Sequence, residues 1–302
     1  MALLLGCGIK PDGNFELYSG TIDSTNRTGD EKNNLSELEE TFPNLDYNKV
    51  IKEQSKIISS GMSITVFKYF VIFSDLDDEL TYKLIDTDIR NTVEAMTNNY
   101  VNKLPDIVTP IYLFSEYDDY KEFVLKNYDI PENDISPYGF FKISKNVIVI
   151  RYVSWKGSIL HEITHRFIKA DFPNAPSWFD EGFASLNEKS VYKNGNLIGD
   201  FSLRIIPLRR AINEDTYTGL QYLMETNDNE LYGKRAPYYY AQARYLLMYL
   251  QENGMLDKYY RNFRDTHEND NTGISQIKEI TGKSLVELDE EYLNYIKSFK
   301  QN

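Results

Sequence analysis

Two kinds of hydrophobic spacing alternate along the chain and predict where strands and helices lie. Residues 146–152 form a β-branched run bounded by polar residues, which predicts a strand. In residues 239–250 the apolar positions instead recur every three or four residues, which predicts a helix that ends near Gly254. The first half of the chain mixes both patterns and the second half is mainly helical, so we expect an α+β fold.

The same reasoning predicts the remaining elements. In the first half we expect helices at residues 47–60, 77–104 and 118–128, and strands at residues 63–73, 107–114, 138–143 and 147–152. The last two strands should form a hairpin around Ser144, Lys145 and Asn146, and Pro110 indicates that its strand lies at an edge of the sheet or its rim. In the second half, the Asn-Gly turn within residues 191–198 predicts a hairpin, and helices are expected at residues 255–264 and 285–299.

One predicted helix separates a packing face from a polar face. Its apolar positions fall at i, i+3, i+4 and i+7, a spacing typical of a stripe that faces the core. They are Leu160, Ile163, Thr164 and Phe167. Ser154 or Ser158 can cap the start of this helix, and Pro173 and Pro176 prevent it from running on. The strand that precedes it can hold an extended peptide by edge pairing.

The polar face carries the sequence His161-Glu162-Ile163-Thr164-His165. Residues i and i+4 of a helix lie one above the other, so His161 and His165 can present two imidazole nitrogens to one metal ion. Glu162 lies about 100° further round the helix, next to a metal-bound water. This is the H-E-x-x-H arrangement, in which the glutamate is the general base of a metalloprotease.

A catalytic zinc ion needs a third protein ligand and an open fourth position. A second helix is predicted from Ser177, a candidate N-cap, and Glu181 lies one turn into it. Two antiparallel helices joined by residues 171–176 can bring this carboxylate to both histidines. With 3 histidines and 1 cysteine, the chain does not fit a closed structural site of four Cys or His ligands. We therefore predict one Zn²⁺ ion bound by His161, His165 and Glu181.

Around these residues the chain resembles a known group of enzymes. The segments HEITH, at residues 161–165, and PSWFDEGFAS, at residues 176–185, are similar to the gluzincin zinc metallopeptidases, and closest to the bacterial MA-like peptidase domains. The likeness covers residues 138–188, with a weaker echo in the Tyr-Ala-Gln sequence that starts at Tyr240. The resemblance implies zinc on His161, His165 and Glu181, with Glu162 as the base. It also implies a mixed-sheet upper lobe followed by a mainly helical C-terminal lobe, with the zinc site in the cleft between.

The chain departs from the related enzymes in three places. The interval from His165 to Glu181 is shorter than in thermolysin or the aminopeptidase-type gluzincins. Thermolysin-like enzymes place an aspartate one turn after the glutamate ligand to orient a histidine, and this chain has Ser185 there, whose hydroxyl can accept a hydrogen bond from an imidazole. The Gly-x-Met-x-Asn segment that aminopeptidase-type members carry before the zinc helix is missing, which favours an endopeptidase over an aminopeptidase.

A further residue is implied by the chemistry of hydrolysis, because a tetrahedral intermediate needs a donor for its developing oxyanion. Gluzincins often use a Tyr or His of the C-terminal lobe for this purpose. Tyr240 lies off the packing stripe, at the start of its helix. It lies about as far beyond the glutamate ligand as the catalytic Tyr does in the aminopeptidase-type enzymes. Its neighbours Tyr238 and Tyr239 leave this choice open, and packing or surface exposure is the competing interpretation.

Two other residues are considered for the site. Arg244 can bind a substrate carboxylate, although the ordinary expectation for an arginine is an exposed position. His267 is interpreted as a surface loop residue.

Charge and composition narrow the choice of partners. A formal charge of -13 and a pI near 4.8, with no basic stripe, argue against nucleic acid. No segment has the roughly 18 apolar residues of a membrane span, so we expect no transmembrane helix. The sequence Leu4-Leu5-Gly6-Cys7 resembles the bacterial lipobox, in which the cysteine is lipidated, although the apolar stretch is short and lacks a charged n-region. Residues 10–40 are polar, like a solvated tether.

These features predict three parts of the chain. Residues 1–44 are interpreted as a truncated signal with a lipobox and a polar tether, residues 45–153 as the N-terminal α/β part of a peptidase unit, and residues 154–302 as the zinc helices and helical C-terminal lobe. Ordered structure should begin near Leu45. A lipidated Cys7 would tether the protein to a membrane of the bacterial cell envelope, or the protein would be secreted. If the lipobox likeness is accidental, the protein is cytoplasmic.

The function predicted is that of a zinc-dependent peptidase, which hydrolyses peptide bonds of a peptide or protein substrate through a zinc-bound water activated by Glu162. The alternative is a lipid-anchored surface binding protein that keeps an inactive peptidase-like domain. A third interpretation is an enzyme of the same fold that acts on another carbonyl, since Glu162 does not distinguish the two substrates.

Overall fold

The computed structural model describes residues 4–9, 15–20, 41–42, 44–59, 61–153 and 157–299. Most of the expected polar tether and the candidate cap Ser154 lie outside these residues. Helices and strands are mixed along the described chain, and the sheet is itself mixed, so the predicted α+β class is confirmed.

The chain divides into two compact units, each of which is described by itself. The first contains Met1–Arg90 and Pro105–Glu162, and the second contains Asn91–Leu104 and Ile163–Asn302. The division at Glu162 falls inside a single continuous helix, α6 (Gly157–Asp171).

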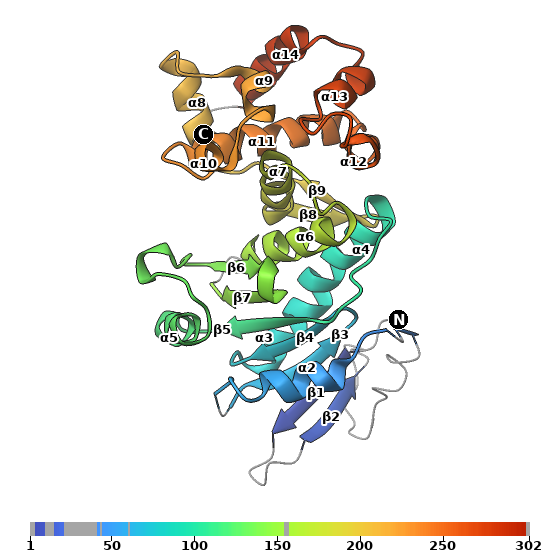
Figure 1. Cartoon of the computed structure of the whole chain (residues 1–302), viewed down its shortest axis with the longest axis vertical. Coiled ribbons are helices and arrows are strands. Elements are labelled where there is room, and N and C mark those ends of the chain that lie inside the picture. The colour runs from blue at the N-terminus through green and yellow to red at the C-terminus, as the bar shows by residue number, and fades with distance from the viewer. Residues whose placement is uncertain are drawn as a thin grey trace. The chain divides into compact units, whose positions relative to one another are not determined.

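The first unit is built around a seven-stranded sheet with the order β2-β1-β3-β4-β5-β7-β6 (Figure 1). Its strands are β1 (Leu4–Ile9), β2 (Phe15–Gly20), β3 (Ser63–Phe67), β4 (Phe70–Ser74), β5 (Thr109–Phe114), β6 (Gly139–Lys142) and β7 (Val147–Arg151). β4, β5 and β7 pair in parallel, and the other neighbours are antiparallel. All residues of β4 and β5 are buried, as expected of interior strands.

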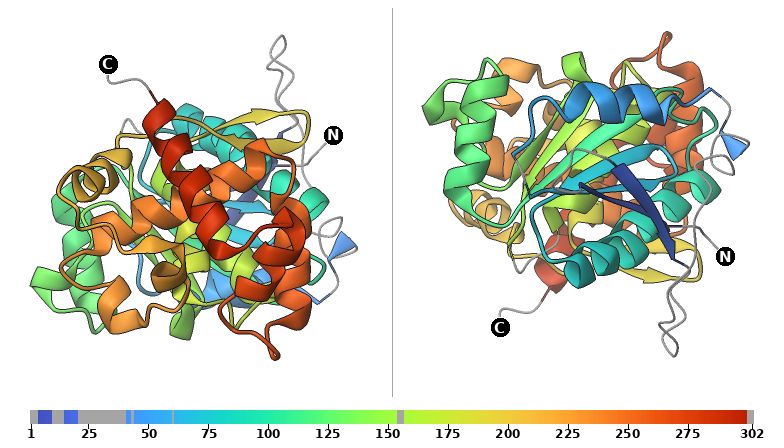
Figure 2. Two further views of the ribbon diagram at one scale, coloured as in Figure 1. Left: turned by 90° about the horizontal axis from the view of Figure 1, so that it is seen from above. Right: turned by 90° about the horizontal axis from the view of Figure 1, so that it is seen from below.

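Helices cover this sheet. They are α2 (Tyr47–Gln54), α3 (Asp78–Lys83), the π-helical segment η1 (Leu84–Ile89), α5 (Tyr117–Asn127) and the 3-10 turns η2 (Glu132–Asp134) and η3 (Ile143–Lys145). The side chain of Tyr112 on β5 holds two of them: its hydroxyl donates to Gln54 Oε1 at 2.6 Å, and its ring lies 4.6 Å from that of Phe123. The right-hand view of Figure 2 shows α2 along one face of the sheet and the helical segment that begins with α3 along the other.

Two expectations for the sheet need correction or refinement. Residues 63–73 form two strands, not one, because the chain turns at Lys68, which has a left-handed φ of 47°. The hydroxyl of Tyr47 donates to the Lys68 carbonyl at 2.6 Å and stabilises this turn. β5 is an interior strand, and Pro110 lies at its rim, one residue before pairing with β7 begins at Ile111. Proline has no backbone N–H to donate, and its position before the first β5–β7 pair means that no hydrogen bond of that ladder is lost.

The sheet also begins earlier than expected. Ordered structure was predicted from Leu45, but the backbone of β1 pairs with both β2 and β3, and Cys7 lies opposite Leu17 and Ile64. Lipidation of Cys7 stays a prediction. None of the helices in the described part of the chain is long and apolar enough to cross a membrane.

The second unit is helical apart from one hairpin. Its helices are α4 (Arg90–Asn99, whose first residue belongs to the first unit), α7 (Ser177–Glu188), α8 (Ile205–Asn213), α9 (Gly219–Met224), α10 (Asp228–Leu231), α11 (Ala236–Glu252), α12 (Leu256–Thr266), α13 (Ile274–Thr281) and α14 (Leu285–Ser298). α11 is central, because α7, α8, α9, α10, α12 and α14 all pack on it. Gly254, with φ of 67°, follows its C-terminus as predicted.

The predicted Asn-Gly hairpin is confirmed as β8 (Ser190–Lys193) and β9 (Asn196–Gly199). Asn194 and Gly195 have φ values of 51° and 79°, the positive values that a type I′ turn requires. α4 is tied to this hairpin, because Tyr192 donates to Glu94 at 2.7 Å and Asn99 donates to the Gly195 carbonyl at 2.9 Å.

The turn before α13 depends on one ionised carboxylate. Asp270 accepts hydrogen bonds from the backbone N–H groups of Thr272, at 2.9 Å, and Ser275, at 2.7 Å. Partial burial would raise its pKa, but the hydrogen bonds from Thr272 and Ser275 outweigh that effect and lower it from 3.8 to about 2. Because the folded pKa is below the unfolded one, this stabilisation is present above about pH 4 and is lost as the pH falls through about 2.

We predict that Asp270→Ala lowers the free energy of unfolding by about 1 kcal/mol at pH 7, comparable to the loss of a helix cap. Urea unfolding at pH 7 and near pH 2 measures the difference between variant and wild type, which should shrink at the lower pH. An equal difference at both pH values would contradict this assignment.

Candidate metal centre

Helix α6, which carries the two candidate histidine ligands, forms with the predicted packing face. Leu160, Ile163, Thr164 and Phe167 are all buried. Ser158 is the second residue of the helix and not its cap, which corrects that expectation. At its other end, Asp171 accepts hydrogen bonds from the backbone N–H groups of Asn102, at 2.9 Å, and Lys103, at 2.7 Å. The direction of α6 is therefore fixed by a buried stripe along its length and a carboxylate at its end.

Helix α7 carries the third predicted ligand. Pro176 occupies the N-cap, and Ser177, which was predicted there, is the first helical residue. Its hydroxyl donates instead to Asp228 at 2.6 Å. The connection from α6 is held by a cluster of aromatic rings, among them Phe172, Phe179 and Phe263, whose pairwise centroids lie 5.3 to 6.1 Å apart.

Gly182, directly after Glu181, lets α7 approach the central helix α11 closely. A Cβ atom at this position would lie 2.8 Å from the Cβ of Ala243 and 3.1 Å from its carbonyl carbon. Only glycine fits here without displacing Ala243. Glu181 therefore supplies the candidate ligand, and Gly182 allows the close packing that positions it.

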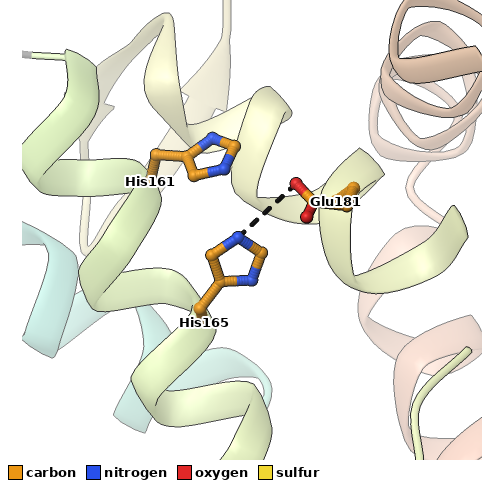
Figure 3. A group of neighbouring side chains, drawn as sticks. All are labelled: His161, His165 and Glu181. Carbon is orange, nitrogen blue, oxygen red and sulfur yellow. Dashed lines mark ion pairs between the residues drawn. The ribbon is translucent and has the colours of Figure 1, made fainter. Parts of the chain in front are cut away.

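His161, His165 and Glu181 come together in the structure, as the sequence predicted. One ligand atom from each lies within 4.8 Å of the others. Figure 3 shows both imidazoles projecting from α6 toward the carboxylate on α7. Nε2 of His165 lies 3.5 Å from Oε2 of Glu181, and ligands of a tetrahedral zinc ion are separated by roughly 3.4 Å, given bonds of about 2.1 Å. The donor set of two imidazoles and a carboxylate could therefore hold a metal ion.

The residue that orients His165 is Asp180, which the sequence reasoning missed. Nδ1 of His165 donates to Oδ1 of Asp180 at 2.7 Å, so Nε2 is the nitrogen directed toward Glu181. The second oxygen of Asp180 lies 2.8 Å from Nζ of Lys169, one turn after His165 on α6. A carboxylate on the outer nitrogen fixes the tautomer and ring orientation of a metal-binding histidine.

Ser185 does not have the orienting role expected of it. Its buried hydroxyl has no hydrogen-bond partner among the described residues, and its carbonyl accepts from Arg244 at 3.0 Å. Ser185, four residues after Glu181, is turned toward the core. Asp180, directly before Glu181, faces α6 instead. The aspartate directly before Glu181 in the sequence was the signal that could have identified the hydrogen-bond partner of His165.

Charge around His165 favours a cation. Burial would lower the pKa of His165, but the carboxylates of Asp180 and Glu181 outweigh this and raise it well above its ordinary value. Burial would likewise raise the pKa of Asp180, but His165 and Lys169 hold it below its ordinary value. Two carboxylates thus compensate a positive charge at one imidazole, and a divalent metal ion satisfies the same electrostatic requirement.

Two tyrosines of the second unit reach Glu181. The hydroxyl of Tyr232, which was not predicted, donates to Oε1 of Glu181 at 3.1 Å. Tyr240 lies one turn inside α11, and its ring meets that of Tyr232 edge-on at 6.4 Å. Burial raises the pKa of Tyr240, and the charge of the nearby Glu181 carboxylate raises it further. The Arg204 guanidinium lies 5.8 Å from the Tyr240 ring centroid.

The alternatives to Tyr240 face elsewhere. The hydroxyl of Tyr238 accepts from the backbone N–H of Thr218 at 3.0 Å, and that of Tyr239 donates to Glu230 at 2.9 Å. Arg244 is fully buried, contrary to expectation, and donates to the carbonyls of Ser185, Lys189 and Asp200, so it stabilises the end of α7.

The two remaining predicted residues lie as follows. Glu162 is half-buried on α6, directly after His161, and is not part of the group of metal-binding atoms. His267 ends α12, with its ring 5.1 Å from that of Phe172 and Nδ1 3.0 Å from the Arg264 carbonyl. It is therefore half-buried against an aromatic ring, where an open surface position was expected.

No protein-family model matches the chain, and no curated protein sequence matches it. The candidate site is therefore identified by its motif and by the geometry of its side chains.

We predict that Asp180→Asn weakens zinc binding by about 10- to 100-fold, because the amide lacks the charge that orients His165. Competition with a fluorescent chelator measures the affinity. Ser185→Ala is the matched control and should bind zinc like the wild type. Equal affinities of Asp180→Asn and wild type would show that Asp180 does not support the site.

We predict that Gly182→Ala lowers the free energy of unfolding by about 1 to 3 kcal/mol, because the added methyl group overpacks the contact between α7 and α11. Chemical denaturation measures the loss. Adding Ala243→Gly removes the methyl group it meets and should recover part of the stability. A single variant as stable as the wild type would contradict the close packing described.

Proposed function

We propose that this protein is a zinc-dependent peptidase of the gluzincin type. The observation that carries the proposal is the convergence of His161, His165 and Glu181 from two helices, with ligand atoms within 4.8 Å of one another. The carboxylate of Asp180 on the outer nitrogen of His165 supports it, because histidines that bind a metal ion almost always donate their other ring N–H to such a partner.

In the proposed mechanism the chain supplies ligands, a base and a donor. A zinc ion held by His161, His165 and Glu181 would act as a Lewis acid and lower the pKa of a water ligand. Glu162 takes the proton from the water that attacks the peptide carbonyl and then gives it to the leaving amine. The place of Glu162 beside His161, on the same turn of α6, supports this role.

We assign stabilisation of the developing oxyanion to Tyr240. Its position beside Glu181 supports the choice, as does the fact that Tyr238 and Tyr239 are engaged elsewhere. A hydroxyl donor aimed at the developing charge is worth about 10²- to 10³-fold in kcat when it acts alone. We propose endopeptidase action on peptides or proteins, because the chain lacks the aminopeptidase segment before α6.

We predict that Glu162→Gln lowers peptide hydrolysis by at least about 10²-fold while zinc stays bound, because the amide cannot accept the proton of the attacking water. The experiment is a peptide-library digest with and without a zinc chelator, combined with metal analysis of the purified protein. Glu122→Gln, at an exposed position of α5, is the matched control and should cleave like the wild type.

Two results would count against the proposal. Full activity in Glu162→Gln would remove the assigned base. Zinc-loaded wild type that binds peptides but cleaves none would instead favour a binding protein with an inactive peptidase-like domain.

A further inference from the structure

The two carboxylate oxygens of Glu181 have different neighbours. Oε2 lies 3.5 Å from Nε2 of His165, the nitrogen that faces away from Asp180. Oε1 accepts the hydrogen bond of 3.1 Å from the hydroxyl of Tyr232. One oxygen is therefore directed toward the candidate metal position and the other toward a tyrosine.

Tyr232 is held over α7 by the short helix that precedes it. Asp228, at the start of α10, accepts a hydrogen bond of 2.6 Å from Ser177 at the start of α7. The side chain of Asn227 caps α10 by accepting from the backbone N–H of Glu230. Tyr232 is the C-cap of α10, so it is fixed four residues beyond the Ser177 contact, over the turn that carries Glu181.

Packing alone does not account for the direction of the Tyr232 side chain. Tyr232 leaves 52% of its surface exposed, and its ring meets that of Tyr240 edge-on at 6.4 Å. A hydrogen bond to an ionised carboxylate is about twice as strong as one between neutral groups. The contact with Oε1 therefore orients both the tyrosine and the carboxylate plane.

The division of the two oxygens matters because a carboxylate can bind a metal ion through one oxygen or both. A catalytic zinc ion with three protein ligands needs its fourth position for water or substrate. A second bond from Glu181 would occupy that position, and a donor on Oε1 competes with it.

We infer that Tyr232 is a positioning residue that keeps Glu181 a one-oxygen zinc ligand and so preserves the open coordination position. This inference rests on the proposed function, since it concerns the same site. It gives Tyr232 a role different from that of Tyr240, which is assigned to the substrate oxyanion.

The test is the visible absorption spectrum of the cobalt(II)-substituted protein, because a four-coordinate cobalt ion absorbs much more strongly than a five-coordinate one. Tyr232→Phe keeps the ring and removes the hydroxyl. Tyr222→Phe is the matched control, since Tyr222 is also exposed, at 44%, and its hydroxyl also donates to a glutamate, Glu230. Thermal unfolding establishes that each variant is folded.

In Tyr232→Phe we expect the cobalt absorption to lose at least half of its intensity while the metal stays bound, and the kcat of the zinc enzyme to fall about 10- to 100-fold. Tyr222→Phe should keep the wild-type cobalt spectrum. An unchanged spectrum in Tyr232→Phe overturns the inference and leaves the proposed function standing. A wild-type protein that binds neither zinc nor cobalt at these residues overturns both.

Discussion

The hydrogen bond between His165 and Asp180 is the interaction on which the rest of the site depends. Asp180 and Glu181 are neighbours on α7, and they approach opposite nitrogens of one imidazole, at 2.7 Å and 3.5 Å. This arrangement sets the tautomer of His165 and the register of α7 against α6 together. The aromatic cluster at the α6–α7 connection and the close approach at Gly182 hold the two helices where both contacts can form.

The site is asymmetric in its charges. His165 lies between two carboxylates, and Lys169 balances one of them from the same helix. The remaining carboxylate, on Glu181, faces the candidate metal position and is approached by Tyr232 and Tyr240. The negative charge of Glu181 is thus partly compensated by the hydroxyl of Tyr232. The compensating group at Oε1 is an uncharged hydroxyl, so it adds no positive charge beside the candidate metal position.

Local patterns in the sequence were sufficient to predict the α+β class, the Asn-Gly hairpin, and the helices that carry the ligands. They failed where a local signal was missing. The turn at Lys68 contains neither glycine nor proline, so residues 63–73 were predicted as one strand. The exposed position predicted for Arg244 was wrong, because its burial depends on three carbonyls from α7 and the segments after it, which only the folded chain brings together.

The ligand triad was predictable because the spacing within α6 is a property of any helix, and the Pro-Ser-Trp context marked α7. The supporting residues were not predictable in the same way. Asp180 was overlooked in favour of Ser185 because the choice depends on which side of α7 faces α6. Tyr232 follows the short helix α10, whose path is fixed by the hydrogen bond between Ser177 and Asp228. These two residues are far apart in the sequence, so no local pattern indicated the contact.

We propose that one zinc ion binds at His161, His165 and Glu181. The most direct measurement is a crystal structure of the zinc-loaded protein with an anomalous difference map at the zinc absorption edge. We expect one strong peak bonded to the two imidazoles and the Glu181 carboxylate, with His165 still hydrogen-bonded to Asp180. A peak bound by other residues, or no peak at saturating zinc, would contradict it.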